Sequence, residues 1–163
     1  MTQLWTHAYI TERMQELFQD FLRYKYPMTL CLFDILEIES LTENYGDEVI
    51  DLVIRKFGEI VREAKRSNDY AGRLDDDLFC IAFPSTPLQS ALIGVERIRD
   101  ALQRAVFSGK SMDNFTVGAT VGVVQLGQRH SDLDELIAEA AELLEKAKEG
   151  GANHIEVADP PTT

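Results

Sequence analysis

The chain has 163 residues, 45% of them hydrophobic, and a formal net charge of −12. This length fits one domain with its own core, and the acidity argues against DNA and RNA as general partners. No stretch reaches the ~20 apolar residues needed to span a membrane, and the N-terminus lacks the basic start of a signal peptide. We therefore expect a cytoplasmic protein with one domain over residues 1–158 and a disordered tail at 159–163.

The spacing of apolar residues predicts ten helices and strands. In chain order they are helix 9–24, strand 28–35, helices 37–45 and 47–65, strands 69–74 and 77–83, helix 86–106, strand 115–126, a helix to Lys148 and strand 154–158. Ser131 followed by Asp134 is similar to a capping box and begins the last of these helices, which Gly150 and Gly151 end.

The order of these elements combines a hairpin with crossover helices. It predicts an α/β (α+β) fold with a mixed central sheet of about five strands flanked by helices. The two cysteines, Cys31 and Cys80, each lie within an apolar run. We expect buried, reduced thiols rather than a disulfide or a metal site.

Four segments of the chain resemble the GGDEF (diguanylate cyclase) family in the same order and spacing. RLDDDLFCIAFP (73–84) is similar to the hairpin in which the family carries R-x-G-G-D/E-E-F. LFDILEIESLTENYGDEVIDLVI (32–54) resembles the first strand and following helices, FTVGATVGVV (115–124) a later strand, and LLEKAKEGGANHI (143–155) the last helix and its exit. The resemblance covers roughly residues 6 to 158 and implies the nucleotidyl-cyclase fold, with the signature on the hairpin.

Diguanylate cyclases join two GTP molecules with the help of carboxylate-bound divalent metals. The resemblance places the metal ligands at Asp34 and Asp77, which both keep a carboxylate. We expect the protein to require no cofactor. The resemblance implies that an Mg²⁺ ion could bind at this vestigial site. The alternative is that Asp34 ends a strand and Asp77 lies in a turn, where carboxylates are common for local reasons.

The rest of the implied catalytic site departs from the family. The signature reads DDDLF, so Asp75 and Asp76 replace two glycines and Leu78 replaces the glutamate before Phe79. Side chains at the glycine positions block the approach of a triphosphate, and their charge repels it. The other implied contacts are Thr42 for a guanine-reading asparagine, Ala152 for a phosphate-binding arginine, and the retained Asp51 and Lys148. Lys148 also fits a plain role at a helix C-terminus. We expect no cyclase activity.

A second family motif is retained. Arg66-Ser67-Asn68-Asp69 matches R-x-x-D at the spacing from the signature at which many cyclases bind their product, cyclic di-GMP. The segment VERIR supplies Arg97 where the family has a further arginine, and Arg73 adds charge nearby. Arginine forks grip guanine edges and phosphates, and a carboxylate accepts from guanine N–H groups. The alternative is a surface ion pair at a helix end, with Arg97 an ordinary exposed residue.

Three functions follow from these motifs. The first is a catalytically inactive receptor that binds cyclic di-GMP at Arg66, Asp69, Arg97 and Arg73. Because the chain has room for one domain, we expect it to signal by contact with a protein partner, with ligand-linked homodimerisation. The second is a protein-interaction module that binds no nucleotide. The third is a GTP-binding or residual cyclase that uses Asp34 and Asp77.

Overall fold

The computed structural model describes residues 5–35, 38–64, 66, 68–75, 78–108 and 114–161, with the side chains of 38–40 left aside. Its elements are, in chain order, α1 (His7–Tyr24), β1 (Met28–Ile35), α2 (Ile38–Tyr45), α3 (Glu48–Ala64), β2 (Tyr70–Arg73), β3 (Leu78–Pro84), α4 (Leu88–Arg104), β4 (Phe107–Ser108), β5 (Asn114–Phe115), β6 (Ala119–Gln125), α5 (Leu133–Glu149) and β7 (Ile155–Val157).

All ten predicted elements are present, but the strand expected at 115–126 is wrong in extent. Residues 114–115 belong to β5, which forms a separate two-stranded sheet with β4, and β6 begins only at Ala119. The rings of Phe107 and Phe115 stack across this small sheet at 5.5 Å. Cross-strand pairing of this kind depends on a partner strand, which an apolar run does not reveal.

The start of α5 also differs from the sequence-based prediction. Its N-cap is Asp132 rather than Ser131, and the Asp132 side chain accepts a hydrogen bond from the backbone N–H of Glu135 at 2.9 Å. The carboxylate of Glu135 accepts in return from the backbone N–H of Ser131 at 2.8 Å. The two carboxylates thus bond one backbone N–H inside α5 and one just before its N-cap, and this reciprocal arrangement begins one residue later than predicted.

The central sheet has five strands in the order β2-β3-β1-β6-β7. β7 is parallel to β6, and the other neighbours are antiparallel, so the sheet is mixed as predicted. β1 lies in the middle, with Asp34 level with Leu78 on β3 and with Thr120 on β6. Because side chains alternate along a strand and paired residues share a face, these three form one row across one face of the sheet.

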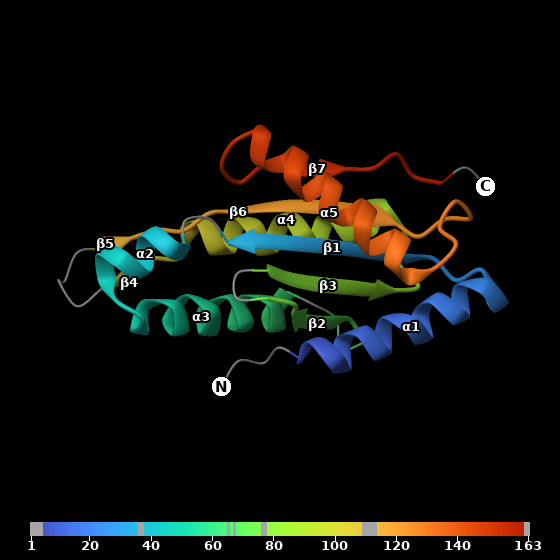
Figure 1. The fold of residues 1–163 in the computed structure, drawn as a ribbon, viewed down its shortest axis with the longest axis horizontal. Helices are drawn as coiled ribbons and strands as arrows, with labels where there is room; N and C mark the ends of the chain where they lie inside the picture. Colours follow the sequence, from blue (N-terminus) through green and yellow to red (C-terminus); the bar gives the residue numbers. More distant parts are fainter. Residues whose placement is uncertain are drawn as a thin grey trace.

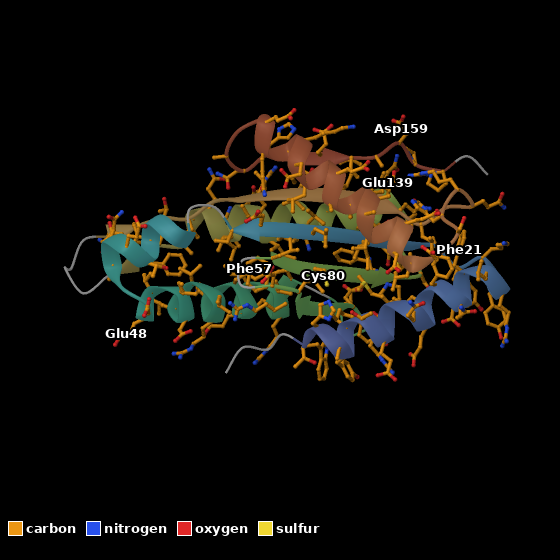
Figure 2. All side chains as sticks on the ribbon, in the orientation of Figure 1. Phe21, Glu48, Phe57, Cys80, Glu139 and Asp159 are labelled. Carbon is orange, nitrogen blue, oxygen red and sulfur yellow. The ribbon has the colours of Figure 1, made fainter. Side chains whose placement is uncertain are left out.

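Helices cover both faces of the sheet (Figure 1). Cys31, Phe33 and Ile35 of β1 point to the core beneath α3 and α4, whereas Leu30 and Leu32 point to the core beneath α1 and α5. On the first face Phe57 contacts Phe33 and Phe79, with ring centroids 5.5 and 4.8 Å apart. Figure 2 shows Phe57 and Cys80 in the interior and Glu48 at the outer rim.

The two thiols are free and buried, as expected from the sequence. Burial raises the pKa of Cys80 to about 12, although a backbone hydrogen bond at Gly72 opposes the shift. Burial likewise raises the pKa of Cys31 well above its ordinary value. Both side chains are therefore neutral packing groups at physiological pH.

Gly122 on β6 lets α5 lie directly on the sheet. A Cβ atom at this position would stand 2.5 Å from the carbonyl oxygen of Ala140 and 2.7 Å from the backbone nitrogen of Leu144. These contacts are with backbone atoms, which cannot move to make room as the end of a flexible side chain can. The close approach fixes the height of α5 and brings its C-terminal turn to the end of β1.

The chain continues past β7 along the sheet. The N–H of Ala158 donates to the carbonyl of Val123 at 3.1 Å, and Pro161 lies beside Gly127. Residues 162–163 lie outside the described residues, so the disorder expected over 159–163 stays a prediction. Among the described helices, none is long and apolar enough to cross a membrane.

Candidate functional site

The hairpin between β2 and β3 ends in a narrow turn. The N–H groups of Leu74 and Asp75 both donate to the carbonyl of Leu78, at 2.8 and 3.2 Å. The side chain of Arg73 braces the same turn, since its Nε donates to the carbonyl of Asp75 at 3.1 Å. Asp75 is exposed. Asp76 and Asp77 lie outside the described residues, so the roles predicted for them remain predictions.

The hairpin brings an apolar side chain to the place where the family has its second acid. Leu78 is half-buried and packs against the core beneath α1 and α5, and Phe79 is fully buried on the opposite face. Leu78 lies level with Asp34 on the neighbouring strand. Asp34 therefore has an aliphatic neighbour on β3, whose side chain offers no oxygen to a metal ion.

Asp34 is paired with Lys148. The Nζ of Lys148 lies 2.8 Å from Oδ2 of Asp34 and 3.0 Å from Oε1 of Glu145, one turn earlier on α5. The Asp34 side chain is 14% exposed and that of Lys148 is 38% exposed. The hydrogen bond to Asp34 raises the pKa of Lys148, with partial burial acting against it and Glu145 adding to it. The ammonium group is thus charged at every physiological pH.

The described residues do not fit a divalent metal at the end of β1. Within the part of the chain that the structure describes, no three His, Cys, Asp or Glu side chains gather as metal ligands. Asp34 already faces the Lys148 ammonium group, and the side chain of Leu78 supplies no oxygen. The second expected ligand, Asp77, is outside the described residues. The Mg²⁺ site at Asp34 and Asp77 therefore stays a prediction that the described residues do not favour.

The other residues assigned to nucleotide contacts lie on α2, on α3 and between α5 and β7. Thr42 is half-buried in α2, and Asp51 is exposed in the first turn of α3. Ala152 is exposed between α5 and β7 and lines a hollow of about 240 Å³. Neither Asp34 nor Lys148 lines that hollow. Ala152 supplies no charge to this hollow, and the polar side chains that line it are Gln103, Thr116 and Asn153.

Asn153 is a structural residue that the sequence analysis missed. It adopts a left-handed backbone (φ 65°), and its Oδ1 accepts from the N–H of Ala119 at 3.1 Å, the first residue of β6. Arg99 on α4 donates to the Asn153 carbonyl at 3.4 Å. Asparagine after Gly151 was a usable signal, because asparagine tolerates the left-handed region better than most residues.

The R-x-x-D segment forms a closed turn between α3 and β2. The backbone N–H of Arg66 donates to Oδ2 of Asp69 at 2.9 Å, and the N–H of Asp69 donates to the carbonyl of Arg66 at 3.1 Å. Asp69 is only 4% exposed, whereas Arg66 is exposed. The aspartate thus fixes the backbone from which Arg66 extends into solvent. Its burial does not suit the alternative of an ordinary exposed ion pair.

The two further arginines lie on different elements. Arg73, at the end of β2, is half-buried, with its guanidinium 5.9 Å from the centre of the Phe79 ring. Arg97 is exposed on α4, which packs beside α3 on the same face of the sheet. The structure thus places Arg66 and Arg97 on neighbouring elements. Their joint contact with a ligand stays a prediction.

Comparisons with known proteins agree with this architecture. The family model for the diguanylate cyclase GGDEF domain matches residues 1–154. The probable diguanylate cyclase DgcC of Escherichia coli K12 is 27% identical over 158 residues, or 97% of this chain and 42% of that protein. The chain thus spans less than half the length of this curated relative.

Two solved structures share the fold. Diguanylate cyclase SiaD of Pseudomonas aeruginosa, in complex with its activator SiaC, superposes with a TM-score of 0.90 at 22% identity, covering 95% of this chain and 59% of that one. The GGDEF domain of DgcB from Caulobacter crescentus, in complex with c-di-GMP, gives 0.90 at 16% identity, with coverage of 96% and 92%. With a family match over nearly its whole length, the chain belongs to the GGDEF domain family of diguanylate cyclases.

Proposed function

We propose that this GGDEF domain does not synthesise cyclic di-GMP but binds it at the R-x-x-D turn and signals through a protein partner. The observation that carries the proposal is the turn between Arg66 and Asp69, which holds a buried carboxylate and an exposed arginine in a fixed relation. A preorganised turn lowers the entropy lost when a ligand is gripped. The DgcB domain, which has the same fold, was solved with c-di-GMP.

The loss of catalysis rests on the composition of the implied active site. Phosphoryl transfer between two GTP molecules needs metals and donors that neutralise the triphosphates. Leu78 lies beside Asp34 in place of an acid, and Ala152 stands in place of an arginine. Asp75 adds an exposed negative charge to the hairpin that would approach the phosphates. Each of these three substitutions weakens the site on its own, and all of them affect the binding and transfer of the GTP phosphates.

Ligand capture rests on the arginines. Arg66 reaches solvent from a braced turn, and Arg97 reaches solvent from the adjacent helix α4. Two guanidinium forks match the two phosphates and the two guanine edges of cyclic di-GMP. In this arrangement Asp69 acts mainly by holding the turn, and Arg73 contributes charge while it braces the hairpin. A positive site on a chain of net charge −12 attracts an anionic ligand locally.

The test is calorimetric titration of the protein with cyclic di-GMP, using Arg66→Ala and Arg97→Ala beside the unaltered chain. We expect binding in the micromolar range or tighter, lost in both variants. Arg55→Ala on α3, which precedes the turn, and Arg104→Ala on α4 each remove one exposed positive charge and should bind normally. Sedimentation at saturating ligand tests the ligand-linked homodimer.

Absence of heat at high ligand concentration would overturn the receptor role and favour a protein-interaction module that binds no nucleotide. Equal losses in Arg66→Ala and Arg55→Ala would mean that net charge, and not the turn, holds the ligand.

A residual cyclase is the second candidate, because Asp34 and Lys148 are both retained and the relative DgcC is named a probable diguanylate cyclase. Incubation with GTP and Mg²⁺ or Mn²⁺, followed by chromatography, separates the two. We expect no cyclic di-GMP to form. Product formation that Asp34→Asn abolishes would establish the enzyme and contradict the proposed loss of catalysis.

A further inference from the structure

The end of β1 carries an ion pair between two residues that the family resemblance assigns to different ligands. Asp34 corresponds to a metal ligand and Lys148 to a phosphate ligand, yet here they bind each other at 2.8 Å. We propose that the Lys148 ammonium is the resident cation of Asp34 and that it excludes divalent metal ions from the end of β1. This inference does not depend on cyclic di-GMP binding, which uses other residues.

The position of Lys148 is fixed from three directions. Gly122 allows α5 to lie against the sheet with backbone-to-backbone contact, which sets the height of the helix. Glu145 holds the same ammonium from within α5 at 3.0 Å. Gly150 ends the helix two residues later, with its N–H donating to the carbonyls of Lys146 and Ala147. The cation is therefore delivered to Asp34 by rigid elements and not by a mobile loop.

The surroundings of Asp34 favour an ammonium over a metal. In the row across the sheet, Leu78 lies on one side of Asp34 and Thr120 on the other. The Thr120 hydroxyl is buried, with no hydrogen-bond partner among the described residues. Among the described residues, this row offers one carboxylate and one hydroxyl, so most of the octahedral shell of an Mg²⁺ ion would have to come from water. The Lys148 ammonium group is held in place by its own side chain on α5, so the Asp34 carboxylate is enough to bind it.

Electrostatics then disfavour a second cation at the same carboxylate. A divalent ion bound to Asp34 would lie within a few ångströms of the Lys148 ammonium, in a setting that is only 14% exposed at Asp34. Like charges at this distance repel strongly where water is partly excluded. Metal binding would require Lys148 to leave, which would break its bond to Asp34.

The experiment is NMR of the ¹⁵N-labelled protein with substoichiometric MnCl₂, whose paramagnetism broadens amide signals near any bound ion, including weakly bound ones. In the unaltered protein we expect no selective broadening of the Asp34 and Ile35 amides. In Lys148→Met we expect Mn²⁺ affinity at this point to rise about tenfold, because one unit of repulsion has gone. The double variant Lys148→Met with Asp34→Asn should lose that broadening.

Lys146→Met is the matched control, since it removes a cation from the same last turn of α5 without touching Asp34. It should behave as the unaltered protein does. Selective broadening at Asp34 with Lys148 in place would overturn the inference. A Lys148→Met protein with a native spectrum and unchanged Mn²⁺ affinity at Asp34 would also overturn it. Should Lys148→Met fail to fold, Lys148→Gln takes its place, and the measurement on the unaltered protein stands independently.

Discussion

The backbone N–H of Arg66 donates to the side chain of Asp69 at 2.9 Å, and the N–H of Asp69 donates back to the Arg66 carbonyl at 3.1 Å. This reciprocal pair closes the turn that joins α3 to β2. It also divides the motif into two roles, because Asp69 is buried and Arg66 is exposed. One residue holds the backbone, and the other lies at the surface.

This division predicts that the two residues differ in their effect on stability. Asp69→Ala removes a buried hydrogen-bonding partner and should lower the free energy of unfolding by about 1–3 kcal/mol. Arg66→Ala changes an exposed side chain and should stay within about 0.5 kcal/mol of the unaltered protein. Urea unfolding followed by circular dichroism measures both. Equal destabilisation by the two substitutions would contradict the division of roles.

Gly122 should tolerate no side chain. Gly122→Ala places a methyl group 2.5 Å from the Ala140 carbonyl, so α5 must shift away from the sheet. We expect a loss of about 2 kcal/mol or more in the free energy of unfolding, in line with overpacked cores. Gly94→Ala is the control, because its Cβ would meet only the Phe83 ring at 3.6 Å and α4 would gain helix propensity. A neutral Gly122→Ala would mean that α5 does not lie as close as described.

The two thiols should be unreactive in the folded protein. Burial raises the pKa of Cys80 from 9.0 to about 12 and raises that of Cys31 as well, so thiolates are absent at pH 8. We expect no reaction with Ellman's reagent in buffer and reaction of both thiols in guanidinium chloride. Because both pKa values are raised, their contribution to stability is complete below pH 9 and is lost as the pH rises towards 12. Fast labelling of the native protein at pH 8 would refute the burial.

Glu139 on α5 should contribute stability that depends on pH. Its partial burial raises the pKa of the carboxyl, but hydrogen bonds from Arg129 and then from His130 outweigh this and lower it. Both partners are close, with His130 Nε2 and Arg129 Nη2 each 2.5 Å from a carboxylate oxygen of Glu139. A lowered pKa stabilises the fold above the ordinary value of 4.5, and this stabilisation is lost as the pH falls through the folded value.

We therefore expect Glu139→Gln to lower the free energy of unfolding at pH 7 by about 1–2 kcal/mol. The difference from the unaltered protein should shrink when the pH falls below 4.5. Glu142→Gln, an exposed position on the same helix, is the control and should leave the pH profile unchanged. Urea unfolding across the pH range measures both variants. A deficit for Glu139→Gln that persists undiminished in acid would point to lost packing instead of lost charge.

Local patterns in the sequence were enough to predict the layered α/β fold. Apolar spacing located every element of the central sheet and its helices, because burial on one face imposes a period of two on strands and 3.6 on helices. The DDDLF turn and the R-x-x-D spacing could likewise be read directly, since both depend on residues close in the chain. The break between β5 and β6 could not, because it depends on pairing with β4.

Other relationships were decided only by tertiary structure. The sequence named Asp34 and Lys148 as ligands for different groups, but they are 114 positions apart and meet only because Gly122 lets α5 lie on the sheet. It named Asp69 as a ligand contact, which stays a prediction, and only the fold shows that this carboxylate is buried and closes the turn. Local periodicity reflects which face of an element is buried, while long-range contacts depend on how closely those faces approach, and no single segment of the chain encodes that distance.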